Sequence, residues 1–113
     1  MPVDGQEVVF EYTAYNESGG KIDSSFRQGR PAQTRLGVNG LIPGFELGIK
    51  GMRMGGKRRI VVPPELGPPV GPSTFFSAKQ YEVFDVELVA IRDCVRRQFL
   101  MTSDVVCEDI KLD

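Results

Sequence analysis

The hydrophobic positions of the N-terminal stretch follow the two-residue period of a β-strand. In residues 6–15, QEVVFEYTAY, the side chains of Phe10, Tyr12 and Ala14 fall at alternate positions. Successive side chains of a strand point to opposite faces of a sheet, so these three would share one face. Residues 16–23, NESGGKID, supply turn-forming residues and then the start of another extended segment. The stretch predicts a strand, a turn and a second strand.

Three further segments have the character of strands. Residues 79–93, KQYEVFDVELVAIRD, alternate most regularly, and most of the apolar bulk lies on the set that includes Glu82, Phe84 and Leu88. Residues 55–64, GGKRRIVVPP, have a basic beginning and an apolar end, and residues 33–38, QTRLGV, form a short extended candidate. Short turns between strands of this kind predict an antiparallel sheet rather than repeated βαβ units.

One segment follows the period of a helix. In residues 43–52, PGFELGIKGM, the apolar side chains of Phe45, Ile49 and Met52 recur at i, i+4 and i+7, which places them on one helical face. A proline before this face and a glycine after it suit the ends of a short helix. Gly48, inside it, lowers the intrinsic helix propensity. The chain is therefore expected to be an α+β domain with one short helix.

The composition of the chain excludes several kinds of catalytic and binding site. The chain has 113 residues, a formal net charge of -1 and no histidine, so it is long enough for one core. The absence of histidine removes Ser-His and Cys-His nucleophilic pairs and most zinc sites. The sequence contains no GxxxxGK[ST] phosphate loop. A balanced charge and the lack of a long apolar run predict neither nucleic-acid binding nor membrane insertion.

The pattern changes after residue 91, so we divide the chain into a domain at 1–91 and a C-terminal extension at 92–113. The extension, RDCVRRQFLMTSDVVCEDIKLD, is amphipathic in places and contains both cysteines. It is either docked on the domain or a partly mobile tail. A helix over residues 95–101 is one expectation for it.

Three motifs resemble the FKBP-type peptidyl-prolyl cis-trans isomerases. They are GGKIDSSF at 19–26, GLIPGFELGIKGMRMGGKRRIVVPPEL at 40–66 and FDVELVAI at 84–91. The resemblance covers residues 8–91. It implies a curved antiparallel sheet, a half-barrel wrapped around one short α-helix, with an apolar pocket between them. It implies isomerisation of X–Pro bonds without a metal or another cofactor.

The resemblance also implies a set of site residues. Phe45 stands at the family's usual tryptophan position and would form the floor of the pocket, and the Ile42 backbone N–H would bind a substrate carbonyl. The catalytic set is Tyr12, Asp23, Ile42, Phe45 and Phe84, and the further substrate-binding set is Ile22, Leu41, Phe75 and Phe76. On composition alone, the aromatic residues would be ordinary core residues, and Asp23 a turn or capping residue.

The sequence also departs from the family pattern. Ile22 and Ala32 occupy positions that are commonly aromatic. Family members usually follow the PPEL motif with Ala-Tyr-Gly, whose tyrosine hydroxyl donates to the bound ligand, whereas here Gly67, Pro68 and Pro69 follow. Prolines lack the N–H that could replace that donor. We therefore expect weak or undetectable isomerase activity.

The loop in which this tyrosine is missing, residues 61–72, contains five prolines and two glycines. Prolines stiffen a surface connection by reducing the entropy of the unfolded chain. The loop could equally be a docking rim for another protein. A third interpretation is that Pro68 or Pro69 enters the chain's own pocket as a pseudo-substrate.

The two cysteines, Cys94 and Cys107, are too far apart in sequence for CxxC redox chemistry. The sequence is compatible with two free thiols and with one disulfide. A disulfide would close a loop of about 14 residues, contribute about 3 kcal/mol in the chain-entropy account, and attach the tail to the domain. A thioredoxin-like reductant could then control tail docking. The basic run KRR at 57–59 is either a solvated strand end or a contact for an acidic partner.

Two functions from different classes follow. One is a prolyl isomerase acting on proline-containing protein clients, and the other is a non-catalytic FKBP chaperone or assembly scaffold under redox control. We expect a monomer. The cysteine-bearing tail and the proline-rich loop further resemble plant chloroplast members of the family, which implies the thylakoid lumen, although no targeting segment is recognisable in residues 1–10.

Overall fold

The computed structural model describes residues 1–38, 40–67 and 80–110, apart from the side chain of Phe99. Along these residues the elements are β1 (Glu7–Tyr15), β2 (Lys21–Ser24), α1 (Ser25–Gln28), β3 (Ala32–Arg35), α2 (Pro43–Lys50), β4 (Lys57–Val62), the 3₁₀ helix η1 (Pro64–Leu66), β5 (Glu82–Phe99) and β6 (Thr102–Asp109). Phe75, Phe76 and most of the proline-rich loop, to which predictions above refer, lie outside the described residues.

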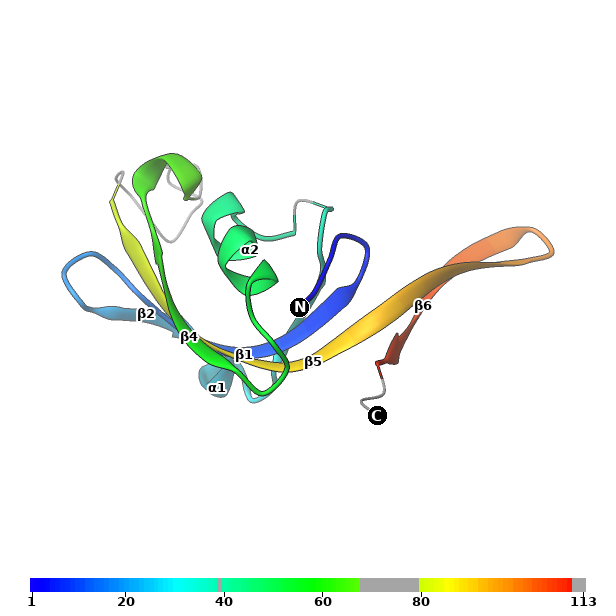
Figure 1. The fold of residues 1–113 in the computed structure, drawn as a ribbon, viewed down its shortest axis with the longest axis horizontal. Coiled ribbons are helices and arrows are strands. Elements are labelled where there is room, and N and C mark those ends of the chain that lie inside the picture. The colour runs from blue at the N-terminus through cyan, green and yellow to red at the C-terminus, as the bar shows by residue number, and fades with distance from the viewer. Residues whose placement is uncertain (39, 68–79, 111–113) are drawn as a thin grey trace.

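The strands form one antiparallel sheet that curves around α2 (Figure 1). The strand order is β2-β1-β5-β4, with β3 paired to the first half of β1 and β6 paired to the second half of β5. Every pairing is antiparallel. The predicted α+β class, with a curved sheet around a short helix, is confirmed.

The core lies between α2 and the concave face of the sheet. Phe45, Ile49 and Met52, the predicted helical face, are at most 3% exposed. They pack with residues of β1, β4 and β5 in one buried cluster. Because burial of an apolar side chain stabilises by about 1.5–3 kcal/mol, this face rather than the sequence's helix propensity fixes α2 on the sheet.

Glycine inside α2 has a packing reason. A Cβ atom at Gly48 would lie 2.6 Å from Cδ1 of Ile60 on β4, and one at Gly44 would lie 2.6 Å from Cγ1 of Val62. These separations are too short for carbon atoms, so glycine at both positions allows the helix to approach β4 closely. The loss of helix propensity predicted for Gly48 is real, but close packing compensates for it.

The extension is a β-hairpin. β5 continues without interruption through residue 99, and its second half pairs with β6 in a ribbon that projects from the body (Figure 1). The helix expected over residues 95–101 is therefore wrong. Pairing explains the difference: Val95 lies opposite Val106 and Cys94 opposite Cys107, so cross-strand contacts outweigh local helical tendency. The division expected between residues 91 and 92 falls inside β5.

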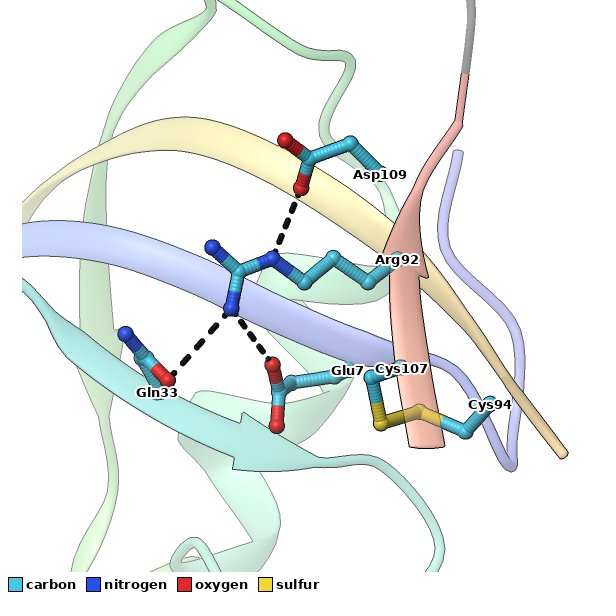
Figure 2. Close-up of polar contacts among 6 residues, drawn as sticks. All are labelled: Glu7, Gln33, Arg92, Cys94, Cys107 and Asp109. Carbon is cyan, nitrogen blue, oxygen red and sulfur yellow. Dashed lines mark hydrogen bonds and ion pairs between the residues drawn. A yellow bond between two sulfur atoms is a disulfide. The ribbon is translucent and has the colours of Figure 1, made fainter. Parts of the chain in front are cut away.

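The structure contains the disulfide between Cys94 and Cys107. It joins two strands of the extension to each other, which corrects the expectation that it attaches the tail to the domain. Arg92 makes that attachment. Its guanidinium donates to Asp109 of β6 at 2.7 Å, to Glu7 of β1 at 3.0 Å and to Gln33 of β3 at 3.5 Å (Figure 2).

Candidate active site

Four aromatic rings gather where β1, α2 and β5 meet. The ring centroid of Phe45 lies 5.2 Å from that of Phe10 and 5.1 Å from that of Phe84, the second contact being edge-to-face. Tyr12 lies 5.8 Å from Phe10. Such tilted pairs contribute about 0.5–1.5 kcal/mol beyond the burial of their area. The cluster is therefore rigid and apolar, with the Tyr12 phenol on its edge.

Tyr12 and Asp23 form the polar end of this cluster. The Tyr12 hydroxyl donates to Oδ2 of Asp23 at 2.8 Å, and the Gln28 amide donates to both groups at 3.3–3.5 Å. Burial, followed by the hydrogen bond to Asp23 and its charge, raises the pKa of Tyr12 to about 12. The phenol therefore stays protonated and remains a donor at neutral pH.

Serines hold this polar end in place. Oγ of Ser25 accepts from the Tyr12 backbone N–H at 2.9 Å and donates to Glu11 at 3.0 Å. Oγ of Ser24 accepts from the Arg27 N–H at 3.0 Å and caps α1. The capping role considered for Asp23 thus belongs to Ser24, and one oxygen of Asp23, Oδ1, accepts from the Ser24 N–H at 2.8 Å.

The remaining predicted residues pack against the buried core. Ile22 of β2 and the pair Leu41 and Ile42 are partly buried and pack against the core. Ile42 is the N-cap of α2, and its carbonyl accepts from the Glu46 N–H at 3.1 Å. Among the predicted site residues that it describes, the structure joins Tyr12 to Asp23 by a hydrogen bond and Phe45 to Phe84 by a ring contact. That the Ile42 N–H binds a substrate carbonyl stays a prediction.

Three residues of this region were not among the predicted site residues. Phe10 contacts Phe45 directly, and its alternation with Tyr12 was a usable signal. Gln28 reaches Tyr12 and Asp23 only because α1 turns back over β1, so no local pattern identified it. Glu82 shares the alternation of Phe84 along β5, which indicated that it would be buried.

Glu82 is the least satisfied polar group of this face. It is 2% exposed, and its Oε2 has no hydrogen-bond partner among the residues that the structure describes. A Cβ at Gly67, which ends η1, would lie 2.8 Å from that oxygen. Burial raises the pKa of the Glu82 carboxyl, because removing a carboxylate from water disfavours its charged form.

Two further features, a metal-binding cluster and a membrane-spanning helix, are not found along the described ranges. There is no group of three or more cysteine, aspartate or glutamate side chains placed to hold a metal ion. In the same part of the chain, no helix is long and apolar enough to cross a membrane.

The sequence profile of the FKBP-type peptidyl-prolyl cis-trans isomerases matches residues 1–89. The chain belongs to this family. It is 63% identical over 108 residues to the chloroplastic peptidyl-prolyl cis-trans isomerase FKBP20-2 of Arabidopsis thaliana, a match that covers 95% of this chain and 45% of the relative. It is 32% identical over 114 residues to the FKBP-type isomerase FkpA of Escherichia coli, covering 96% of this chain and 39% of that protein. The FKBP domain therefore spans less than half the length of these two relatives.

Solved FKBP structures share the fold. The crystal structure of FkpA from Escherichia coli matches with a TM-score of 0.72 and 36% identity, over 80% of this chain and 41% of that one. The crystal structure of AtFKBP13 matches with a TM-score of 0.68 and 33% identity, over 77% and 79% of the two chains.

Proposed function

We propose that this FKBP domain binds X–Pro segments of protein clients and catalyses their cis-trans isomerisation weakly. The aromatic cluster around Phe45, with the Tyr12–Asp23 pair on its edge, is the observation that carries the proposal. The two relatives are both named as peptidyl-prolyl cis-trans isomerases, which supports the same activity here. In this proposal Phe45 and Phe84 contact the prolyl ring, Tyr12 and Asp23 form one polar edge, and the Ile42 N–H binds a carbonyl.

Such a site needs no nucleophile. Rotation of an X–Pro bond crosses a barrier of about 18–20 kcal/mol that arises from amide resonance. An apolar surface that excludes water favours the twisted amide, in which resonance and its charge separation are lost. The Tyr12 phenol, kept protonated by a pKa of about 12, can orient flanking polar groups without exchanging a proton.

Weak activity follows from what the domain lacks. Ile22 and Ala32 are partly buried against the core at positions that are aromatic in the family resemblance, and Gly67 ends η1 where a tyrosine turn would follow. The lost tyrosine hydrogen bond and the lost ring at each of these two positions each reduce binding of the transition state by about 1 kcal/mol, about 3 kcal/mol in all. Together they lower kcat/KM by about 10².

A protease-coupled assay on a proline-containing tetrapeptide tests this proposal. We expect measurable isomerisation at about 1% of the rate typical of small active FKBP domains. Phe84→Ala should remove it, whereas Leu47→Ala, on the exposed face of α2, should leave it unchanged. Activity at the full family rate would show that the missing tyrosine is dispensable. If neither variant lost activity, the reaction would take place away from the aromatic cluster.

The second candidate is a non-catalytic chaperone or assembly scaffold. The observation that favours it is the projecting hairpin, whose tip residues Leu100 and Met101 are about fully exposed, at 102% and 97%. Suppression of client aggregation by a Phe84→Ala variant without isomerase activity would support this candidate. If the Phe84→Ala variant lost its suppression of aggregation as well as its isomerase activity, this candidate would be contradicted.

Redox control is part of this proposal. The Cys94–Cys107 disulfide is the group on which a thioredoxin-like reductant would act. Both assays, run before and after reduction, should differ if the hairpin regulates function, and a Cys94→Ser/Cys107→Ser variant should match the reduced protein. Equal activity in both states would remove the regulatory role.

We also propose a chloroplast location, and the thylakoid lumen within it. The chloroplastic relative supports the organelle, and the disulfide is compatible with an oxidising compartment. Fractionation of intact chloroplasts, with an antibody to this chain, tests both levels. Recovery with the stroma would retain the organelle and exclude the lumen. We further propose a monomer, which light scattering at several concentrations tests.

A further inference from the structure

From residue 103 onward, the outer edge of β6 has no strand partner in the described part of the chain. β6 pairs with β5 alone, and β5 extends beyond the start of β1 at Glu7. Residues 103–109 of this edge, SDVVCED, contain neither proline nor lysine, two residues that commonly protect strand edges. An edge strand with outward N–H groups is a template for another strand.

The ribbon that carries this edge is firmly held. The Cys94–Cys107 disulfide crosses it, and Arg92 connects β6 to the body through Asp109 and Glu7 (Figure 2). On its other face, Gln6 donates to Asp93 at 2.8 Å. A two-stranded ribbon is marginally stable by itself, so these links preserve an edge that contributes little to the core.

Backbone geometry identifies which N–H groups of β6 face outward. The Ile110 N–H donates to the Ile91 carbonyl at 2.9 Å, whereas the Cα atoms of Cys94 and Cys107 are 4.1 Å apart, the narrow spacing of a pair without backbone hydrogen bonds. By alternation, the N–H groups of residues 103, 105 and 107 point away from β5. The Val105 N–H donates to Oδ1 of the neighbouring residue, Asp104, at 2.8 Å.

Charge on the same edge is acidic. Asp104, Val106 and Glu108 share one face of the ribbon, and across from them β5 contributes Asp93 and one cation, Arg97. The closest approach of Arg97 to Glu108 is 3.9 Å, and the Glu108 side chain is 76% exposed. Asp93 already accepts from Gln6. The carboxylates of Asp104 and Glu108 are therefore poorly neutralised.

We propose that the outer edge of β6 binds an extended segment of a partner protein that carries two cationic side chains four residues apart, with an apolar residue between them. Its backbone pairs with residues 103, 105 and 107 and replaces the Asp104 oxygen at the Val105 N–H. Its cations then meet the released Asp104 and Glu108, and the apolar residue meets Val106. A second copy of this chain fits less well, because its own β6 would add only acidic charge to this face. This inference does not depend on isomerase activity.

A synthetic heptapeptide, Thr-Lys-Thr-Val-Thr-Lys-Thr, tests the inference against the oxidised, ¹⁵N-labelled chain. The matched control replaces both lysines by glutamates. We expect slower amide exchange at Ser103, Val105 and Cys107 on adding the lysine peptide, and binding of the glutamate peptide at least about tenfold weaker. Equal binding of both peptides, no binding, or protection away from β6 would overturn the proposal.

Two variants separate the charge from the backbone. Asp104→Asn/Glu108→Gln removes both carboxylates and should weaken lysine-peptide binding about tenfold, whereas Glu17→Gln/Glu65→Gln, which removes two charges elsewhere, should leave it unchanged. Val105→Pro deletes one outward N–H without deleting a bond to β5 and should also weaken binding. If this proline disrupts the hairpin spectrum, the charge variants decide alone.

Self-association is the remaining outcome. Protection of the same three amides that grows with protein concentration and without any peptide would show that a second copy occupies the edge. That result would overturn the heterologous partner proposed here.

Discussion

The body of the domain and the hairpin are parts of one sheet, yet they are stabilised in different ways. In the body, Phe10, Phe45 and Phe84 pack face and edge in a core that is at most 9% exposed. In the hairpin, Val95 is 54% exposed, and the strands are held by a disulfide and by ion pairs at the base. β5 belongs to both regions, so pairing alone does not explain stability. The difference is how much apolar area each region buries.

The largest effect is expected in the body. Phe45→Ala removes a ring that contacts two others and should lower the free energy of unfolding by about 3–5 kcal/mol. Leu47→Ala, two residues along α2 and 63% exposed, should change it by less than about 0.5 kcal/mol. Urea unfolding of both variants measures the difference. Similar losses in the two would mean that the aromatic cluster is not the stabilising centre.

The next effect is confined to the hairpin. Reduction of Cys94–Cys107 reopens a loop between cysteines 13 positions apart, with an expected cost of about 3 kcal/mol. Amide exchange at Val106 should become about 10² faster, while exchange at Leu88, fully buried in β5, should not change. Faster exchange at both sites would show that the two regions unfold together.

Glu82 offers a gain of stability in the body. Its folded pKa is raised by burial, so its contribution is greatest below the unfolded pKa, about 4.3, and declines as the pH rises through the folded value. Glu82→Gln removes that decline and should stabilise the protein at pH 7, because the amide has no charge to desolvate. The difference between the two proteins should vanish near pH 3. A variant less stable than wild type at pH 7 would show that the carboxylate has a favourable role.

The smallest effect concerns the joint between the regions. Arg92→Met removes donors to Asp109 and Glu7, but the Arg92 side chain is 29% exposed, so we expect a loss of about 1 kcal/mol or less. Arg97→Met, at a separation of 3.9 Å from Glu108, should cost less than about 0.3 kcal/mol. Thermal unfolding at low and high salt checks both, and an equal, salt-independent loss would contradict an ionic joint.

Local patterns predicted the parts of the fold whose burial follows a simple period. The i, i+4, i+7 spacing of Phe45, Ile49 and Met52 predicted α2, and alternation predicted that Phe84 faces the core. Tyr12 and Asp23 were placed in one site by resemblance, and they are hydrogen-bonded. The predictions for α2 and for Phe84 succeeded because side-chain direction in a helix or a strand is a local property.

Other features depend on residues far apart in the sequence. Residues 95–99 have no strong local preference, and they form a strand because residues 102–106 lie beside them. Gln28 joins the site only through the turn of α1, and the unpaired oxygen of Glu82 is defined by its surroundings rather than by its neighbours in the chain.

From its sequence alone, this protein is an FKBP domain with a curved sheet, a short helix and an aromatic core, because periodicity and motif spacing act over a few residues. Tertiary structure alone decided that the extension is a hairpin, that its disulfide joins strand to strand, and that an acidic edge lies open along β6. The physical reason is that backbone pairing and burial depend on which segments meet, and the chain must fold before they do.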